Sequence, residues 1–302
     1  MNTFTDNVYR TRREELEAVH RGGAGGIEIC LRHSLLVDQL VKSVLDAASG
    51  AAPPLAVVAV GGYGRQELCF GSDVDLLLLV RRLDDRSTAL SKDVFYGLLG
   101  LGLAVSHAVR TTSDCIKMAP DTETITALLD GRFIAGDLSL FRDLERRLRD
   151  WVARHGPQVR QQIAESFAVR HGKYRSATYL FEPHVKEGVG GLRDAQALVW
   201  AARAAGLSPG GMGDLAGLGA VDAEEAELLK TSVDFLLRVR NHLHVSSGKK
   251  NDRLLFAGQR EVAAFFGLGG EGPEPVEAFM RLYQKRASEL AYLARLILRR
   301  LG

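Results

Sequence analysis

Two aspartates two positions apart, Asp73 and Asp75, are the residues of this chain best suited to metal chemistry. They stand at the start of the apolar run VDLLLLV, residues 74–80, which predicts a buried strand. Side chains two apart on a strand point to the same face, so the carboxylates would repel each other without a cation between them. Mg²⁺ prefers such hard oxygen ligands and keeps positions open for substrate phosphates. An ordinary solvent-facing strand end carries the same pair, so its surroundings must decide.

A glycine turn precedes the aspartates, with Gly61, Gly62 and Gly64 directly after a valine-rich run over 55–60. Glycine lets the backbone approach a ligand closely and adopt positive φ. A turn that leads from a strand into a helical turn also presents N–H groups to phosphate. Arg65 would add a charge-assisted contact and Ser72 a hydroxyl. Tight hairpin loops use the same glycines, so the turn is informative only together with the aspartates.

The elements around these residues predict a small α/β unit. Strands are expected over 55–60, 74–80 and 104–111, with a helix over 87–101, and the first 50 or so residues have helical periodicity. After residue 121 no strand is expected, and four long helices are predicted over 137–154, 157–180, 222–247 and 275–300. Glycine-rich stretches at 188–191 and 206–219 interrupt them, the second as a flexible loop.

The predicted fold class is therefore an α+β core with a small mixed sheet, followed by an all-α helical bundle. The expected domains are N-terminal helices over 1–50, the core over 51–135 and the bundle over 136–302.

Composition excludes several classes of protein. The net charge is only +2, from 39 basic and 37 acidic residues, which disfavours nucleic acid as a partner. The apolar runs fall far short of the roughly 20 residues of a membrane helix, and the polar N-terminus lacks the apolar core of a signal peptide. The three cysteines are scattered and form no CxxC pair, so a zinc site or a disulfide framework is not expected. We expect a cytoplasmic protein without a membrane partner.

The run G-G-Y-G-R-x-x-L-x-x-x-S-D-x-D-L-L, residues 61–77, resembles the signature of the DNA polymerase β-like nucleotidyltransferase superfamily. The resemblance implies that Asp73 and Asp75 are catalytic and hold Mg²⁺, or Mn²⁺, against a nucleoside triphosphate. It also implies that the glycine turn with Arg65 and Ser72 contacts the phosphates. In that chemistry a nucleophile attacks the α-phosphate in line and pyrophosphate leaves.

Two later blocks are similar to bacterial PII uridylyltransferases. The matching positions are Glu182, Pro183, Lys186, Gly190, Gly191, Leu192, Arg193 and Asp194 in the first block, and Arg238, Leu243, His244, Asp252, Arg253, Leu254 and Gln259 in the second. This resemblance implies UTP as substrate, a tyrosine of the PII signalling protein as acceptor, and nucleotide contacts from Lys186 and Arg193.

Residue chemistry leaves three points open. Arg193 falls in the first turn of a helix, where a cation opposes the helix dipole, so it needs a partner such as phosphate or a carboxylate, or forms a surface salt bridge. Arg240 and His244 lie four apart on an apolar stripe, where a structural hydrogen-bond network is favoured over a nucleotide contact. The strand over 104–111 lacks the third carboxylate of many polymerase β-like enzymes, which leaves the general base unassigned between candidates such as His107 and Asp114.

The function also has alternatives. The first is adenylyl transfer, or transfer of another nucleotide, to a different protein, because nothing in the sequence selects uracil over adenine. The second is a nucleotide-binding regulatory module that has lost catalysis. The family continues into an HD phosphodiesterase domain and paired ACT domains, and this chain contains no His-Asp dipeptide. We therefore expect attachment of the nucleotide only, at a rate that does not respond to glutamine.

Overall fold

The computed structural model describes residues 3–49, 55–207 and 221–302. Packing divides the chain into two compact units. The sheet unit comprises Met1–Leu16, Cys30–Leu68 and Ser72–His155, and the helical unit comprises Glu17–Ile29, Cys69–Gly71 and Gly156–Gly302. Each unit is described by itself, and the expected domain boundaries after residues 50 and 135 stay a prediction.

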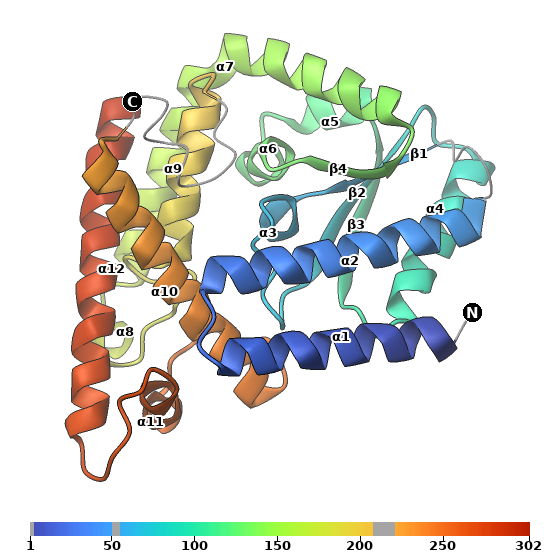
Figure 1. Cartoon of the computed structure of the whole chain (residues 1–302). Coiled ribbons are helices and arrows are strands. Elements are labelled where there is room, and N and C mark those ends of the chain that lie inside the picture. The colour runs from blue at the N-terminus through green and yellow to red at the C-terminus, as the bar shows by residue number, and fades with distance from the viewer. Residues whose placement is uncertain (1–2, 50–54, 208–220) are drawn as a thin grey trace. The chain divides into compact units, whose positions relative to one another are not determined.

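A four-stranded mixed sheet forms the centre of the sheet unit (Figure 1). Its spatial order is β3-β2-β1-β4, with bounds β1 Leu55–Ala59, β2 Val74–Val80, β3 Val105–Thr111 and β4 Arg132–Gly136. β1 pairs antiparallel with both β2 and β4, whereas β2 pairs parallel with β3. The small mixed sheet and the first three strands confirm the prediction from sequence.

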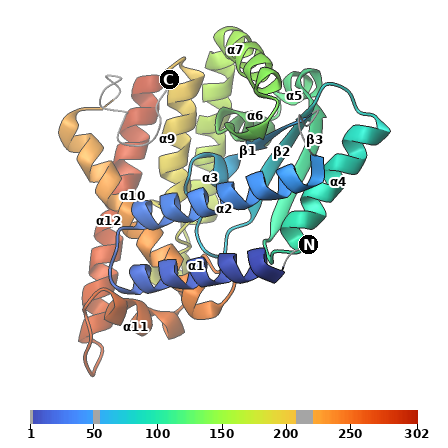
Figure 2. The same ribbon diagram turned by 45° about the vertical axis from the view of Figure 1, so that its right-hand side comes forward.

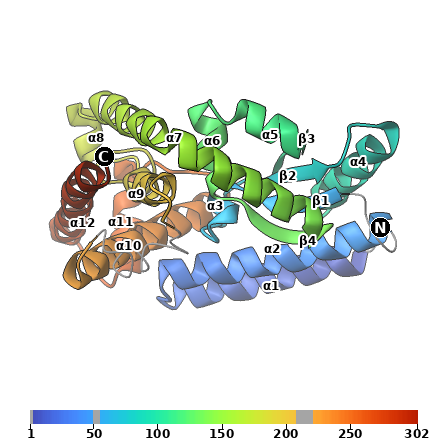
Figure 3. The same cartoon turned by 90° about the horizontal axis from the view of Figure 1, so that it is seen from above.

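Helices cover both faces of this sheet, as the view from above shows (Figure 3). One face packs against α1 (Thr3–Arg21), α2 (Gly26–Ser49) and α4 (Asp85–Leu99), with Leu55, Val57 and Ala59 of β1 in that core. The other face packs against α5 (Thr112–Met118), α6 (Thr122–Leu129) and α7 (Leu138–Lys173), with Ala56 and Val58 in that core. Burial on both faces explains why β1 and residues 76–80 of β2 are continuous apolar runs without polar alternation.

Strand β4 contradicts the expectation that no strand follows residue 121. It is a five-residue edge strand, and of its residues only Ile134 is buried, so its local pattern carries little strand signal. Its pairing with β1, which includes Ala56 opposite Gly136, stabilises it. The strand therefore depends on a partner about 80 residues earlier in the chain, and local periodicity could not predict it.

The prediction of two separate helices over 137–154 and 157–180 is also wrong. The single helix α7 runs from Leu138 to Lys173 with Pro157 inside it, and the short helix α8 (Ala177–Phe181) follows. Proline removes one helical hydrogen bond but does not end this helix. Its neighbour Gly156 packs against α9, because a Cβ there would lie 2.2 Å from the carbonyl oxygen of Ala204.

The helical unit is built around α12 (Glu274–Leu301), which packs against α9 (Leu192–Ala204), α10 (Ala223–Ser247) and α11 (Phe256–Phe265) (Figure 2). Fully buried side chains in this bundle include Leu198, Leu236, Phe279 and Leu290. The predicted helices over 222–247 and 275–300 are confirmed, whereas α5, α6 and α11 were not predicted. The predicted loop over 206–219 falls almost entirely outside the described residues. None of the described helices is long and apolar enough to cross a membrane.

Candidate functional site

The aspartate pair and the glycine turn meet at the start of β2. Asp75 is the second residue of this strand, and Asp73 directly precedes it. The N–H of Val60 donates a 3.0 Å hydrogen bond to the carbonyl oxygen of Asp75, which joins the turn to the strand. Gly61 has a φ of +57°, and a Cβ there would lie 3.3 Å from Oδ2 of Asp75. The turn therefore approaches one of the two predicted metal ligands closely.

The donor set fits a magnesium ion shared between protein and substrate. Among the described residues, no group of three or more histidines, cysteines, aspartates and glutamates could hold a metal alone. Mg²⁺ is commonly bound by one or two carboxylates together with substrate phosphates and water, rather than by a cage of protein ligands. Asp73 and Asp75, both half-buried, supply hard carboxylate oxygens of this kind.

The three glycines of the turn, within the short helix α3 (Gly61–Gly64), have different surroundings. A Cβ on Gly64 would lie 2.1 Å from the carbonyl oxygen of Asp130, so Gly64 is required for packing. A Cβ on Gly62 would meet its nearest neighbours, Arg65 and Glu67, only at 3.8 Å. The first hydrogen bond of α3 runs from the Gly64 N–H to the carbonyl oxygen of Val60. The N–H groups of Gly61 and Gly62 lie before it and therefore make no hydrogen bond within the helix. Gly62 is thus the position where a ligand has most room.

Arg65 is bound by carboxylates of the protein. Its side chain is only 6% exposed, its Nη1 donates to the fully buried Asp130, and its Nε donates to Glu67 at 2.8 Å. These contacts connect the end of α3 to the residue after α6. The phosphate contact predicted for Arg65 therefore remains a prediction. Sequence reasoning did not find the partner Asp130, because Asp130 lies 65 positions after Arg65 in the chain.

A second polar network, formed by Tyr63, Asp38 and Arg132, holds the glycine turn in place. The hydroxyl of Tyr63 donates to Asp38 at 2.6 Å, and Arg132 donates to both oxygens of Asp38 at 2.7 and 3.0 Å. Arg132 also donates to the carbonyl oxygen of Tyr63 at 3.2 Å. Burial and the neighbouring Asp38 raise the pKa of Tyr63 far above its ordinary value, so the hydroxyl stays protonated. The tyrosine of the motif thus helps to hold the glycine turn in place.

The candidate general bases differ in their surroundings. Asp114 accepts hydrogen bonds from the hydroxyl of Thr111 at 2.6 Å and from its N–H at 3.2 Å, which caps α5 and lowers the pKa of Asp114. A carboxylate stabilised in this way is a weaker proton acceptor. The His107 ring lies 4.3 Å, centroid to centroid, from the Phe95 ring. Ser106, on the strand that lacks a third carboxylate, is the β3 residue opposite Asp75.

Ser72 is the last of the predicted phosphate-binding residues in the sheet unit. Its Oγ is buried and has no hydrogen-bond partner among the described residues. The phosphate contact predicted for this hydroxyl is untested.

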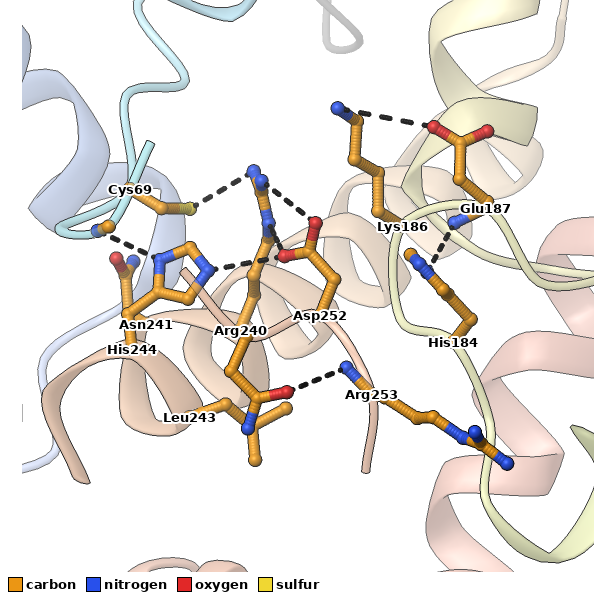
Figure 4. A network of polar contacts seen from close by, with 12 residues as sticks. Cys69, His184, Lys186, Glu187, Arg240, Asn241, Leu243, His244, Asp252 and Arg253 are labelled. Atoms are coloured by element: carbon orange, nitrogen blue, oxygen red, sulfur yellow. Dashed lines mark hydrogen bonds and ion pairs between the residues drawn. The ribbon is translucent and has the colours of Figure 1, made fainter. Parts of the chain in front are cut away.

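The helical unit brings Lys186 and Arg193 together (Figure 4 labels Lys186 and its neighbour Glu187). The Arg193 N–H donates a 2.9 Å hydrogen bond to the carbonyl oxygen of Lys186. The Arg193 guanidinium donates to Glu187 at 3.1 Å and to Gln196 at 2.9 Å. Of the partners considered for Arg193, the structure therefore shows a carboxylate.

Arg240 and His244 form the structural network favoured from the sequence (Figure 4). Arg240 donates to Asp252 at 2.7 Å, and His244 Nε2 lies 3.1 Å from the same carboxylate. Burial opposes ionisation of Asp252, but His244 and Arg240 outweigh it and hold the pKa of Asp252 well below its usual range. Burial lowers the pKa of His244, so its ring is neutral.

Comparison with known proteins agrees with these motifs. Residues 157–298 match the family model described as GlnD PII-uridylyltransferase. The chain is 36% identical, over 97% of its length, to the bifunctional uridylyltransferase/uridylyl-removing enzyme of Cereibacter sphaeroides. It is also 36% identical, over 94% of its length, to the enzyme of the same name from Methylococcus capsulatus.

The chain is thus similar to the PII-uridylyltransferase family, by the family model over residues 157–298 and by the two relatives over nearly its whole length.

The match to the PII-uridylyltransferase family model covers Lys186, Arg193, Arg240 and His244 of the helical unit. The similarity to the two relatives extends over nearly the whole chain. The chain spans about a third of their length, 32% and 33% respectively.

Proposed function

We propose that this chain transfers UMP from UTP to a tyrosine of the PII nitrogen-regulatory protein and releases pyrophosphate. The observation that carries the proposal is the 36% identity, over 97% of the chain, to a bifunctional uridylyltransferase/uridylyl-removing enzyme. The aspartates at the start of β2, beside a glycine turn, support a nucleotidyltransferase core. UTP and PII are proposed as cytoplasmic partners.

The proposed reaction is an in-line displacement at phosphorus. The tyrosine oxygen attacks the α-phosphorus of UTP and forms a new P–O bond. The bond from the α-phosphorus to the oxygen that bridges to the β-phosphate breaks, and this oxygen leaves with pyrophosphate. The tyrosine proton passes to a base or to water.

Asp73 and Asp75 would hold Mg²⁺ or Mn²⁺, which when bound neutralises negative charge on the triphosphate. The rest of the turn orients the substrate. Gly62 leaves room for the phosphates, and the absence of a side chain on Gly61 keeps Oδ2 of Asp75 uncrowded. The ion pair of Arg65 with Asp130 and the hydrogen bond of Tyr63 to Asp38 hold the backbone of the turn. A preorganised site of this kind avoids rearrangement during the reaction.

The test is transfer of label to PII. The chain is incubated with PII, Mg²⁺ and UTP labelled at the α-phosphate, in parallel with labelled ATP. We expect labelled PII with UTP, much less with ATP, and none when the acceptor tyrosine of PII is replaced by phenylalanine. Equal transfer from ATP, or no transfer with any nucleotide, would contradict the proposal.

A further inference from the structure

The outward face of α12, the last helix of the helical unit, carries a regular stripe of exposed residues. The helix packs against α9, α10 and α11 on its other sides and runs along the edge of this unit (Figure 1). The exposed residues recur at alternating intervals of four and three positions, which is the spacing of a coiled-coil seam. This α12 seam consists of Glu274, Ala278, Arg281, Lys285, Ser288, Tyr292, Arg295 and Arg299. Residues with this spacing share one face, so a single partner helix can contact them all.

The polar side chains of the seam are available to a partner. Within the described part of the chain, no ion pair involves the side chains of Glu274, Arg281, Arg295 and Arg299, or of Glu277, which is exposed beside the seam. Lys285 pairs with Glu289 of the same helix at 4.0 Å. The ring of Tyr292 is 65% exposed. The packing of the helical unit therefore does not use most of these groups.

Charge is distributed unevenly along the seam, with acidic residues at its N-terminal end and basic residues beyond them. The helix dipole favours a carboxylate in the first turn and a cation in the last, where Glu274 and Arg299 lie. Its effect does not extend to Arg281 and Lys285, which lie in the N-terminal half of the helix beyond the first turn. It also does not account for an exposed aromatic ring between cations. A partner helix with the complementary order of groups accounts for both features.

We propose that two copies of this chain associate through the α12 seam, with the two helices antiparallel about a twofold axis between positions 286 and 287. Each charged residue then meets a group of complementary chemistry in the second copy: Glu274 meets Arg299, Glu277 meets Arg295, Arg281 meets the ring of Tyr292, and Lys285 meets the hydroxyl of Ser288. These are carboxylate–guanidinium pairs, a cation over an aromatic face and an ammonium donating to a hydroxyl. The twofold axis repeats every contact, so the seam is complementary to itself.

Other registers of the same two helices bring cations together. A parallel pair would place Arg281 and Arg295 each beside its own copy. Moving the antiparallel pair by one heptad places Arg281 opposite Lys285 in one direction and opposite Arg299 in the other. In the proposed register the closest like charges are the two copies of Lys285 near the axis, where Glu289 offsets their repulsion. The order of charges therefore selects one register.

The predicted dimer is weak and sensitive to salt. One helix from each copy makes a small interface, and exposed ion pairs contribute little individually, so we expect a dissociation constant of roughly 10–100 µM. Because the pairing relies on exposed charges, added salt should weaken it. The pairing does not depend on the proposed transfer of UMP.

The first test measures the mass of the full chain by sedimentation velocity at concentrations up to a few hundred micromolar. Glu277→Arg and Arg295→Glu each place like charges opposite one another, so both variants should stay monomeric where the parent chain dimerises. Lys230→Glu, a charge reversal at an exposed position of α10, should dimerise as the parent does. A parent chain that is monomeric throughout, or a dimer that either seam variant leaves unchanged, would overturn the proposal.

A one-to-one mixture of the two seam variants separates loss of pairing from loss of folding. In a mixed dimer the arginine introduced at position 277 faces the glutamate introduced at position 295. The unchanged Arg295 of one copy likewise faces the unchanged Glu277 of the other. The mixture should therefore regain the parent's dissociation constant to within a few-fold, although neither variant dimerises alone. A mixture that stays monomeric would show that these two positions do not face each other.

Cysteine cross-linking tests the register, because the three native cysteines are all buried. In the proposed dimer the two copies of position 288 lie about 4.5 Å apart along the helix axis, whereas the two copies of position 278 lie about 26 Å apart. A short bis-maleimide should therefore join two chains of Ser288→Cys and leave Ala278→Cys as monomer. Cross-linking of Ala278→Cys, or of neither variant, would exclude the antiparallel pairing.

Discussion

The backbone N–H of Gly71 donates a 2.9 Å hydrogen bond to Nδ1 of His244, a residue 173 positions later in the chain. An N–H donor requires Nδ1 to be the acceptor, so the proton of the neutral ring is on Nε2, where it is donated to Asp252. The contact leaves little room for a side chain at residue 71, since a Cβ there would lie 3.0 Å from Cγ of His244 and from the Lys250 nitrogen. One histidine therefore connects the segment Cys69–Gly71 to Asp252.

Replacing His244 should destabilise the helical unit. His244→Ala removes the acceptor of the Gly71 N–H and one donor to Asp252, and we expect a loss of about 1–3 kcal/mol in the free energy of unfolding. His244→Asn should lose less, because its side-chain oxygen can replace Nδ1. Urea unfolding followed by circular dichroism measures both. Equal losses for alanine and asparagine would show that the Gly71 hydrogen bond contributes little.

Neutralising either aspartate should abolish transfer and preserve the fold. Asp73→Asn and Asp75→Asn each remove a charge expected to bind the metal, so the rate of UMP transfer should fall about 100-fold or more. The fold should be retained, because Asp73 and Asp75 are both half-buried at the start of β2 and asparagine is nearly isosteric with aspartate. Rate measurements over a range of Mg²⁺ concentrations are the check. Transfer at the parent rate by both variants would exclude these residues as metal ligands.

Gly62 and Gly64 should respond differently to substitution. Gly62→Val adds a side chain beside the proposed phosphates, with its Cβ at an ordinary van der Waals distance of 3.8 Å from the described neighbours, so the dissociation constant for Mg-UTP should rise while the fold is retained. Gly64→Ala places a Cβ 2.1 Å from a carbonyl oxygen, so the fold itself should be destabilised. Calorimetric titration and thermal unfolding of both variants separate the effects. An unchanged dissociation constant for Gly62→Val would mean that the phosphates lie elsewhere.

The buried partner of Arg65 should matter more for stability than an exposed ion pair. Asp130→Ala removes one of the carboxylates that bind the buried guanidinium of Arg65 and leaves Glu67 beside it, and we expect a loss of about 3–5 kcal/mol. Glu15→Gln breaks an exposed pair with Arg12 and should cost at most about 0.5 kcal/mol. Urea unfolding of both variants makes the comparison. Similar small losses would argue against a structural role for the Arg65–Asp130 pair.

Stability should fall on acidification through the buried histidines. Burial lowers the pKa values of His20 and His33 to about 4, below the ordinary value of 6.5. Between these values the unfolded chain binds more protons than the folded chain, so stability is present above about pH 6.5 and is lost as the pH falls toward 4. The thermal midpoint should therefore be lower at pH 5 than at pH 7.5.

His20→Phe tests this origin of the acid sensitivity. Both ring nitrogens of His20 are buried without a hydrogen-bond partner among the described residues, and the ring packs against Phe70 and Phe265. Phenylalanine should keep the packing, remove the buried polar atoms and flatten the dependence of the midpoint on pH. A pH profile as steep as that of the parent chain would assign the sensitivity to other groups.

Local features of the sequence determined the elements and the family. The run over 74–80 predicted β2 at its observed bounds, because a strand buried on both faces is apolar at nearly every position. The long helices after residue 222 followed from apolar spacing, which is a property of each segment alone. The glycine turn and the aspartates stand within 15 residues of one another, so their order was sufficient to indicate the nucleotidyltransferase resemblance.

Tertiary structure alone decided the partners of individual side chains. The sequence did not indicate that Arg65 is bound to Asp130, and Gly64 is small because the backbone of Asp130 packs against it. β4 forms because it pairs with β1. His244 is neutral because burial lowers its pKa and because its Nδ1 accepts the Gly71 N–H. Each of these depends on residues 65 or more positions away in the chain. Periodicity and propensity are local, whereas burial and hydrogen-bond pairing arise only when distant segments pack together.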